Sequence, residues 1–342
     1  MTDQRRPVLA LDIGGTKLAV AVVTEDGATH GLVVEPTRRD DGPDSIIRRL
    51  FAMGREAIVA GGLGPVSAVG ISCGGPLNAA TGVLESPLHL PGWVDVPIVA
   101  LAEQEFGIPA VLENDATAAA LGEFRYGAGV GISTLLYLTI STGIGGGAVI
   151  DGRLHRGAAG NGGEYGHIMV RPGGRACLCG RRGCLEAYAS GSSIAARAAD
   201  VLASSAAPAS TLRALRVVQA RDVAAAAAAG DALARALWDE TTQLLSVAIT
   251  DLVNIVEPDL VVLGGGVTRA GDALLQPIKT RVLNEAMRPA ASVVRIELAG
   301  LGDVVCAVGA AALAFDLIDA RSAPKSAPHS GSSTQTEEST HV

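Results

Sequence analysis

Short apolar runs and stretches of helical periodicity follow one another along most of the chain. The apolar runs predict β-strands at 8–13, 18–23, 28–34, 65–72, 109–112, 132–150 and 260–267 and near 293–297. Apolar positions at helical spacing predict helices at 44–60 and 97–106, from 115 onward, over much of 192–257, and at 272–285 and 304–320. Strands that alternate with helices indicate an α/β fold built in layers.

One segment repeats the pattern of the opening segment. LYLTISTGIGGGAVI, within 132–150, can be aligned with LALDIGGTKLAVAVV, near the N-terminus, as strand, Gly/Thr turn and strand. Such an internal repeat predicts two similar halves, each of which begins with a hairpin.

Composition narrows the class of protein. The chain of 342 residues is long enough for two domains, and 48% apolar residues are typical of a globular protein. The net charge is -8 and no long Lys/Arg run is present, which argues against a nucleic-acid surface. The first residues lack the long apolar stretch of a signal peptide. Residues 126–150 carry no charge, but seven are Gly and five are Ser or Thr, which favours two strands over a membrane helix.

Glycine-rich turns follow three of the predicted strands. They read GGTK after residue 13, STGIGGG after residue 140 and GGG after residue 263. Glycine lets backbone N–H groups approach phosphate oxygens closely, so three such turns favour a nucleotide site. None of them has the GxxxxGK[ST] or the GxGxxG spacing, which predicts a phosphate site of another kind.

Asp115 follows a predicted strand and opens an Ala-rich helix. This position is compatible with a helix N-cap carboxylate. It is also compatible with a general base at a strand end, where the active sites of open α/β sheets lie. Asn114 beside it offers both a donor and an acceptor to a hydroxylated substrate.

Three of the five cysteines lie within eight residues, ten positions after a histidine. The spacing His167-x9-Cys177-x-Cys179-x4-Cys184 supplies the Cys3His set of a structural zinc site. It is too tight for a disulfide framework, so we expect a reducing cytoplasm. Zinc would hold Glu164 and Glu186 near each other. Carboxylates and an imidazole N–H suit sugar hydroxyls, so the metal is predicted to shape a substrate loop and take no part in the chemistry.

These motifs resemble the ROK family of bacterial sugar kinases and related regulators, which have the actin-like ATPase fold. The matching pieces, in the family's order, are LDIGGTK, LENDATAAALGE, STGIGGG, GEYGH, CLCGRRGCLEAYASG and VVLGGGV. They span almost all of the chain from about residue 8 to residue 315.

The resemblance implies a two-domain actin-like ATPase (ribonuclease H-like) fold, which is an α/β fold with a cleft between the domains. We expect a small N-terminal domain at 1–117, completed by a C-terminal helix at about 304–321. A larger domain at 118–303 would carry the zinc loop, residues 167–184, which contains the expected zinc ligands. Residues 322–342 are rich in Ser, Thr and Pro, which predicts a disordered tail.

The resemblance also implies roles for individual residues. Asp115 is expected to be the catalytic base. The expected sugar contacts are Asn114, Glu164, His167 and Glu186. The expected nucleotide contacts are Asp12, Gly14, Gly15, Thr16, Lys17, Thr142, Gly143, Gly264, Gly265 and Gly266. The expected zinc ligands are His167, Cys177, Cys179 and Cys184.

The implied activity is phosphorylation of a hexose at its 6-hydroxyl by ATP with Mg²⁺, with glucose as the first expectation. The alternatives are an N-acetylmannosamine or N-acetylglucosamine kinase, and a non-catalytic sugar-sensing regulator without its DNA-binding domain. Eleven residues precede Asp12, too few for the helix-turn-helix domain of the regulators. Polyphosphate is an alternative donor. We expect a cytoplasmic homo-oligomer, dimer or tetramer, with no nucleic-acid or membrane partner.

Overall fold

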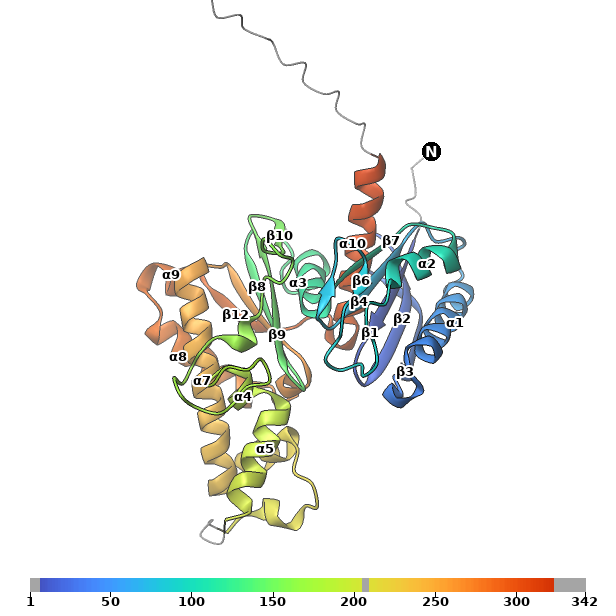
Figure 1. Ribbon diagram of the computed structural model, residues 1–342. Coiled ribbons are helices and arrows are strands. Elements are labelled where there is room, and N and C mark those ends of the chain that lie inside the picture. The colour runs from blue at the N-terminus through green and yellow to red at the C-terminus, as the bar shows by residue number, and fades with distance from the viewer. Residues whose placement is uncertain (1–6, 205–208, 323–342) are drawn as a thin grey trace, which may run out of the picture.

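The computed structural model describes residues 7–204 and 209–322, which form two five-stranded sheets and the helices around them (Figure 1). The first sheet has the order β3-β2-β1-β4-β7, with β1 Val8–Ile13, β2 Lys17–Val23, β3 Thr29–Pro36, β4 Val69–Cys73 and β7 Ala110–Asn114. The second has the order β10-β9-β8-β11-β12, with β8 Leu135–Ile140, β9 Ile144–Ile150, β10 Arg153–His155, β11 Leu260–Gly264 and β12 Arg295–Leu298. A short hairpin pairs β5 Leu77–Asn78 with β6 Val83–Leu84.

The two sheets have the same topology. In each sheet, the first three strands along the chain form an antiparallel meander. The other two strands lie on the opposite side of the first strand and run parallel to it. The prediction of two similar halves, each beginning with a hairpin, is therefore confirmed.

Helices cover the first sheet on both faces. Along β1, Leu9 and Leu11 pack with α1 (Pro43–Gly61) and α2 (Ile98–Phe106). Val8 and Ala10 point to the other face and pack against α10 (Val305–Ser322). Burial on both faces explains why β1 and β2 are runs of apolar residues without alternation.

The second sheet carries most of the remaining helices. They are α4 Glu186–Ala189, α5 Gly191–Leu202, α6 Ala220–Ala228, α7 Ala232–Val256, α8 Asp272–Glu285 and α9 Arg288–Val293. Short 3₁₀ turns are η1 Arg39–Asp41, η2 Tyr165–His167, η3 Thr211–Ala214, η4 Gly266–Ala270 and η5 Gly302–Val304. Within the described ranges, no helix combines the length and the apolar character needed to cross a bilayer.

Helix α3 (Asp115–Tyr126) and helix α10 lie between the two sheets (Figure 1). They cross at two glycines. A Cβ atom on Gly309 would lie 1.8 Å from the carbonyl oxygen of Ala118, and one on Gly122 would lie 3.0 Å from the backbone nitrogen of Gly309. Only glycine allows this close approach.

The chain passes between the two halves twice. Residues 127–134 lead from α3 to β8, and residues 299–304 lead from β12 back to α10. Helix α10 returns to the first sheet, where the sequence placed the closing helix. Ser322, predicted as the first tail residue, still belongs to α10, and residues 323–342 lie outside the described part of the chain.

Candidate active site

The start of α3 separates two roles that the sequence left open for Asp115. The N-cap is Asn114, whose Oδ1 accepts hydrogen bonds from the backbone N–H groups of Ala116 and Thr117 at 3.0 and 3.2 Å. Asp115 is the first helical residue. Its Oδ1 accepts from the N–H of Ala116 at 2.8 Å. The Oδ1 acceptor of Asn114 is therefore occupied by the helix cap, and its amide NH2 is the group left to bind a ligand. This differs from the expectation that Asn114 offers both a donor and an acceptor.

Two carboxyl groups lie close together at this point, those of buried Asp12 and half-buried Asp115. Asp12, at the end of β1, is 7% exposed, and its Oδ1 accepts a hydrogen bond from the hydroxyl of Ser72 at 2.8 Å. Burial raises the pKa of Asp12 to about 7, and the Asp115 carboxylate adds to this rise. Burial also raises the pKa of Asp115, against the charge of His89, which lowers it. Sequence reasoning did not single out Ser72 or His89.

A second buried carboxylate near the site was also missed. Glu113 is 1% exposed, and its Oε2 accepts from Nε of Arg156 at 2.6 Å. Its Oε1 accepts from the N–H of Asn114 at 3.0 Å. Glu113 belongs to the first sheet, and Arg156 follows β10 of the second, so the pair joins the two halves beside Asp115. No signal pointed to this pair, because Glu113 lies just after the strand predicted at 109–112, and only the longer β7 (Ala110–Asn114) buries it.

The three polar residues predicted around the zinc loop do come together. Partial removal from water raises the pKa of Glu164, His167 lowers it, and the charges of Glu186 and Asp115 raise it further. His167 Nε2 lies 3.6 Å from Oε2 of Glu164. Glu186 has a contact that the sequence did not predict, because its Oε2 accepts from the N–H of Ile144 at 2.8 Å. Its carboxylate thus connects the zinc loop with the second glycine turn.

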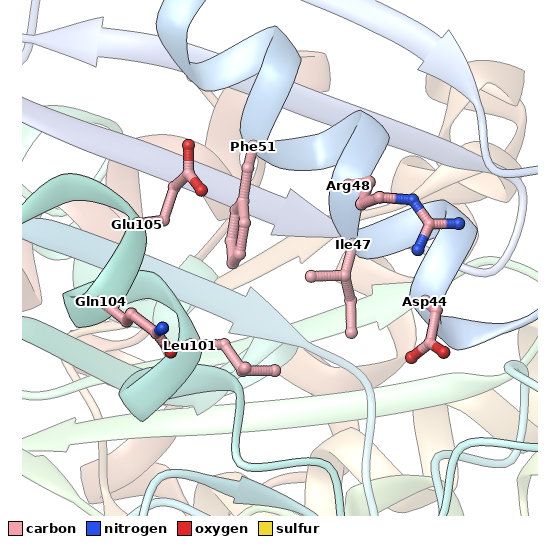
Figure 2. Close-up of a pocket in the computed structure, with 7 residues that line it drawn as sticks. All are labelled: Asp44, Ile47, Arg48, Phe51, Leu101, Gln104 and Glu105. Carbon is pink, nitrogen blue, oxygen red and sulfur yellow. The ribbon is translucent and has the colours of Figure 1, made fainter.

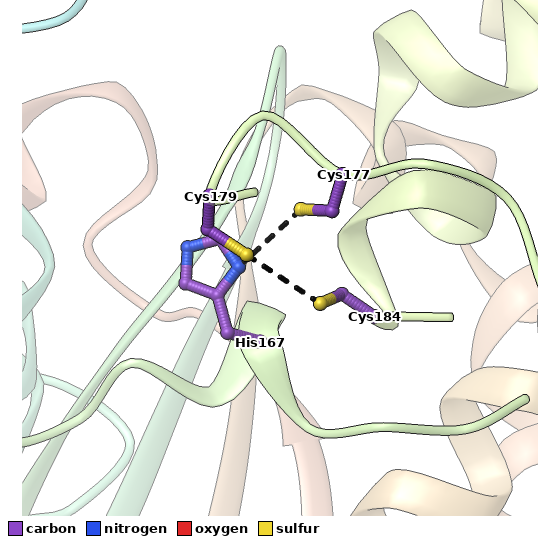
Figure 3. A group of neighbouring side chains, drawn as sticks. All are labelled: His167, Cys177, Cys179 and Cys184. Atoms are coloured by element: carbon purple, nitrogen blue, oxygen red, sulfur yellow. Dashed lines mark hydrogen bonds between the residues drawn. The ribbon is translucent and has the colours of Figure 1, made fainter. Parts of the chain in front are cut away.

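The Cys3His set forms a compact cluster (Figure 3). The four potential ligand atoms lie within 4.8 Å of one another. Sγ of Cys179 lies 3.6 Å from Sγ of Cys184, and Sγ of Cys177 lies 3.6 Å from Nδ1 of His167. Tetrahedral zinc with Zn–S bonds of about 2.3 Å separates sulfur atoms by roughly 3.8 Å, so the donor set fits this ion.

Local hydrogen bonds prepare one thiol for a metal. The backbone N–H of Arg181 is the main cause that lowers the pKa of Cys179 to about 7, which favours the thiolate that binds metal. Nδ1 of His167 faces the sulfur atoms and Nε2 faces Glu164, so the imidazole lies between the cysteine side chains and Glu164.

The three glycine turns gather around the same region. A Cβ on Gly265, whose φ is +89°, would lie 2.6 Å from the carbonyl oxygen of Ile140, so the third turn packs directly against the second. A Cβ on Gly145 would lie 3.1 Å from Cβ of Ala116, which brings the second hairpin to the start of α3. The first turn also lies at the start of α3, because the Asp115 carboxylate raises the pKa of Asp12.

Lys17 has an additional contact. Its Nζ donates to the carbonyl oxygen of Asp303 at 3.2 Å, and the carboxylate of Asp303 accepts from Arg269 in η4 at 3.0 Å. Thr16, Thr142 and Gly266, by contrast, are exposed to solvent. Their backbone and hydroxyl groups are accessible to a ligand.

A separate groove lies between α1 and α2 (Figure 2). Its volume is about 410 Å³. Its lining residues are Asp44, Ile47, Arg48, Phe51, Leu101, Gln104 and Glu105. None of the predicted site residues lines it, so the groove has no part in the candidate active site.

Comparisons with known proteins agree on one family. The family model described as the ROK family matches residues 8–316. A glucokinase of Halalkalibacterium halodurans is 35% identical over 306 residues, which are 88% of this chain and 92% of that protein. An N-acetylmannosamine kinase of Citrobacter koseri is 36% identical over 268 residues, 78% of this chain and 86% of that protein.

A solved structure is similar over nearly the whole fold. It is the ROK family glucokinase of Streptomyces griseus in complex with glucose and AMPPNP, with a TM-score of 0.76 and 32% identity. The similarity covers 91% of this chain and 99% of that one.

Proposed function

The chain belongs to the ROK family and is an ATP-dependent sugar kinase with the actin-like ATPase fold, as its motifs implied, and we propose glucose as the substrate and the 6-hydroxyl as the acceptor. The observation that supports this most is the placement of Asp115. Its half-buried carboxylate lies at the start of α3, between the glycine turns and the polar residues of the zinc loop.

We propose that Asp115 is the base. Its carboxylate accepts the proton of the 6-hydroxyl while the sugar oxygen bonds to the terminal phosphorus of ATP and the bond to the bridging oxygen breaks. The raised pKa of Asp115 makes the group a stronger proton acceptor than an exposed aspartate. Most of the remaining catalysis in phosphoryl transfer comes from positioning and charge stabilisation.

The glycine turns supply that positioning for the nucleotide. Their backbone N–H groups, with Lys17, face the phosphates in this proposal. The Asp115 carboxylate raises the pKa of Asp12, so the two acidic groups lie close together, and a positive charge beside them would offset their repulsion. Mg²⁺ bound with ATP would supply that charge, and these two carboxylates are the residues that would face it. The Cys3His cluster would hold a structural zinc ion.

On the sugar side we propose contacts from Asn114, Glu164, His167 and Glu186. With Asp115 on the 6-hydroxyl, the zinc-loop group lies toward the other end of the ring, near the 1- and 2-hydroxyls. The substituent at carbon 2 then decides the choice among hexoses. An N-acetylated sugar needs additional space at that end, and the N-acetylmannosamine kinase relative makes it the second candidate.

A substrate panel tests the proposal. We expect kcat/KM to be highest for glucose, lower for mannose and much lower for N-acetylmannosamine and N-acetylglucosamine. Where buried polar partners are left unpaired, discrimination reaches about 10⁴-fold. A preference for an acetylated sugar would show that glucose is not the main substrate, and would leave the kinase mechanism unchanged. Running each sugar with ATP and with polyphosphate identifies the donor. The cytoplasmic location and the homo-oligomer remain predictions.

A further inference from the structure

A fully buried carboxylate lies where the chain passes between the two halves. Glu123, in the last turns of α3, is 0% exposed. Its Oε2 accepts from the N–H groups of Ala128 and Gly300 at 2.9 and 3.0 Å, and its Oε1 accepts from the N–H of Leu301 at 2.9 Å. No part of the proposed mechanism uses this group.

These three donors come from both connecting segments. Ala128 belongs to 127–134, which leads into the second half, and Gly300 and Leu301 belong to 299–304, which leads back. The packing is tight, since a Cβ on Gly127 would lie 2.1 Å from Oε2 of Glu123. A single side chain therefore forms hydrogen bonds with both of the chain segments that connect the two halves.

The same point is rigidly connected to the candidate active site. Glu123 lies on the helix that begins with Asp115, and the neighbouring Gly122 lies in the glycine crossing of α3 with α10. Two residues beyond Leu301, Asp303 contacts Lys17 of the first half and Arg269 of the second. A change of angle at this point would therefore move the catalytic groups of one half relative to those of the other.

We propose that the carboxylate of Glu123 is the pivot of closure between the two halves, and that it acts as a positioning residue for sugar binding. The inference rests on the proposed function, because that function places Asp115 and the zinc-loop residues on opposite halves around one sugar. Closing two halves around a substrate requires a few backbone positions to absorb the rotation. Three hydrogen bonds to one carboxylate hold those positions together while neighbouring backbone angles change.

Glu123→Gln tests the pivot in the full-length enzyme. The substitution keeps the size but replaces one acceptor oxygen by an NH2 group, which faces a backbone N–H and repels it. The closed arrangement is then populated less, and the apparent sugar affinity falls in proportion to that population. We expect KM for glucose to rise about tenfold with kcat changed by less than about threefold, because saturating sugar restores closure.

Asp231→Asn is the matched control. Asp231 also accepts backbone N–H groups, from Thr211 at 2.7 Å and from Ala234 at 3.0 Å, but it lies among the helices of the second half. It should lower thermal stability while leaving KM for glucose unchanged. Small-angle scattering adds a direct readout. Glucose should reduce the radius of gyration of the wild type and of Asp231→Asn, and should reduce that of Glu123→Gln only at higher glucose concentration.

Hydrogen exchange on the wild type covers the case in which Glu123→Gln does not fold. A pivot predicts that the amides of Ala128, Gly300 and Leu301 are protected both without and with glucose. Free exchange of these amides in either state would overturn the proposal. A folded Glu123→Gln that has the wild-type KM for glucose and the wild-type fall in radius of gyration would overturn it as well. If the wild type phosphorylates no hexose, the proposed function fails instead, and that result is distinct from either outcome.

Discussion

Asp12 should make the folded protein less stable as the pH rises, and Asp12→Asn should remove this effect. The pKa of Asp12 is raised by burial from 3.8 to about 7. The folded state therefore holds this proton more tightly than the unfolded state. Between these two values the unfolded state binds fewer protons, so the free energy of unfolding decreases with increasing pH. Below 3.8 and above about 7 the contribution is constant.

The size of the effect follows from the shift. Each pKa unit corresponds to about 1.4 kcal/mol, so a rise of about three units destabilises the folded state by about 4 kcal/mol at pH 8, as an upper limit. About 3 kcal/mol of this develops between pH 4.5 and pH 8. Asparagine has the same shape and does not titrate. Its Oδ1 can still accept the hydrogen bond that Ser72 donates to Asp12.

Urea unfolding of both proteins at pH 4.5 and pH 8 measures this directly. We expect Asp12→Asn to be the more stable protein at pH 8, with a gap that narrows by about 3 kcal/mol at pH 4.5. The free energy of unfolding of Ser72→Ala should fall more between pH 4.5 and pH 8 than that of the wild type, because the substitution removes the hydrogen bond that lowers the pKa of Asp12. A gap that is equal at the two pH values, or a less stable Asp12→Asn at pH 8, would refute the reasoning.

Three other outcomes are expected. Asp115→Asn should bind glucose but lose about 10²- to 10⁴-fold in kcat, the usual contribution of a positioned base; steady-state kinetics and sugar titration check this, and a wild-type kcat contradicts it. Elemental analysis of protein purified without added metal should find one zinc per chain, and Cys179→Ser should lower both the zinc content and the melting temperature; active protein without zinc would contradict the site. Gly309→Ala should cost about 3 kcal/mol or more of stability in urea unfolding, because its Cβ would lie 1.8 Å from the carbonyl oxygen of Ala118; an unchanged midpoint would show that α3 and α10 separate easily.

The features that the sequence predicted are those encoded by short spacings. The two hairpins were visible because each strand, turn and strand lies within about twenty residues, and both sheets repeat the same strand order. The four potential zinc ligands lie within one segment of the chain, so their spacing alone brought them together. Asn114 and Asp115 show the limit of this approach, since a sequence pattern does not distinguish an N-cap from the next residue.

The features that were missed depend on pairs far apart in the chain. Glu113 and Arg156 are 43 residues apart, and Glu123 and Gly300 are 177 residues apart. A buried carboxylate must have partners, but local patterns do not reveal which distant segment supplies them. The contact between Glu186 and Ile144 likewise depends on how the zinc loop folds over the second hairpin, which no spacing within either segment describes.

Helix α10 has a consequence for how the protein is made. Ala307, Ala311 and Phe315 cover the face of the first sheet formed by Val8 and Ala10. A ribosome adds about 5 to 20 residues per second, so roughly 15 to 60 s separate the synthesis of β2 from that of α10. During this time the strands of the first sheet emerge without the helix that shields one of their apolar faces. The half that is synthesised first is thus completed only near the end of translation. Its uncovered apolar face is where chaperone protection is most needed until then.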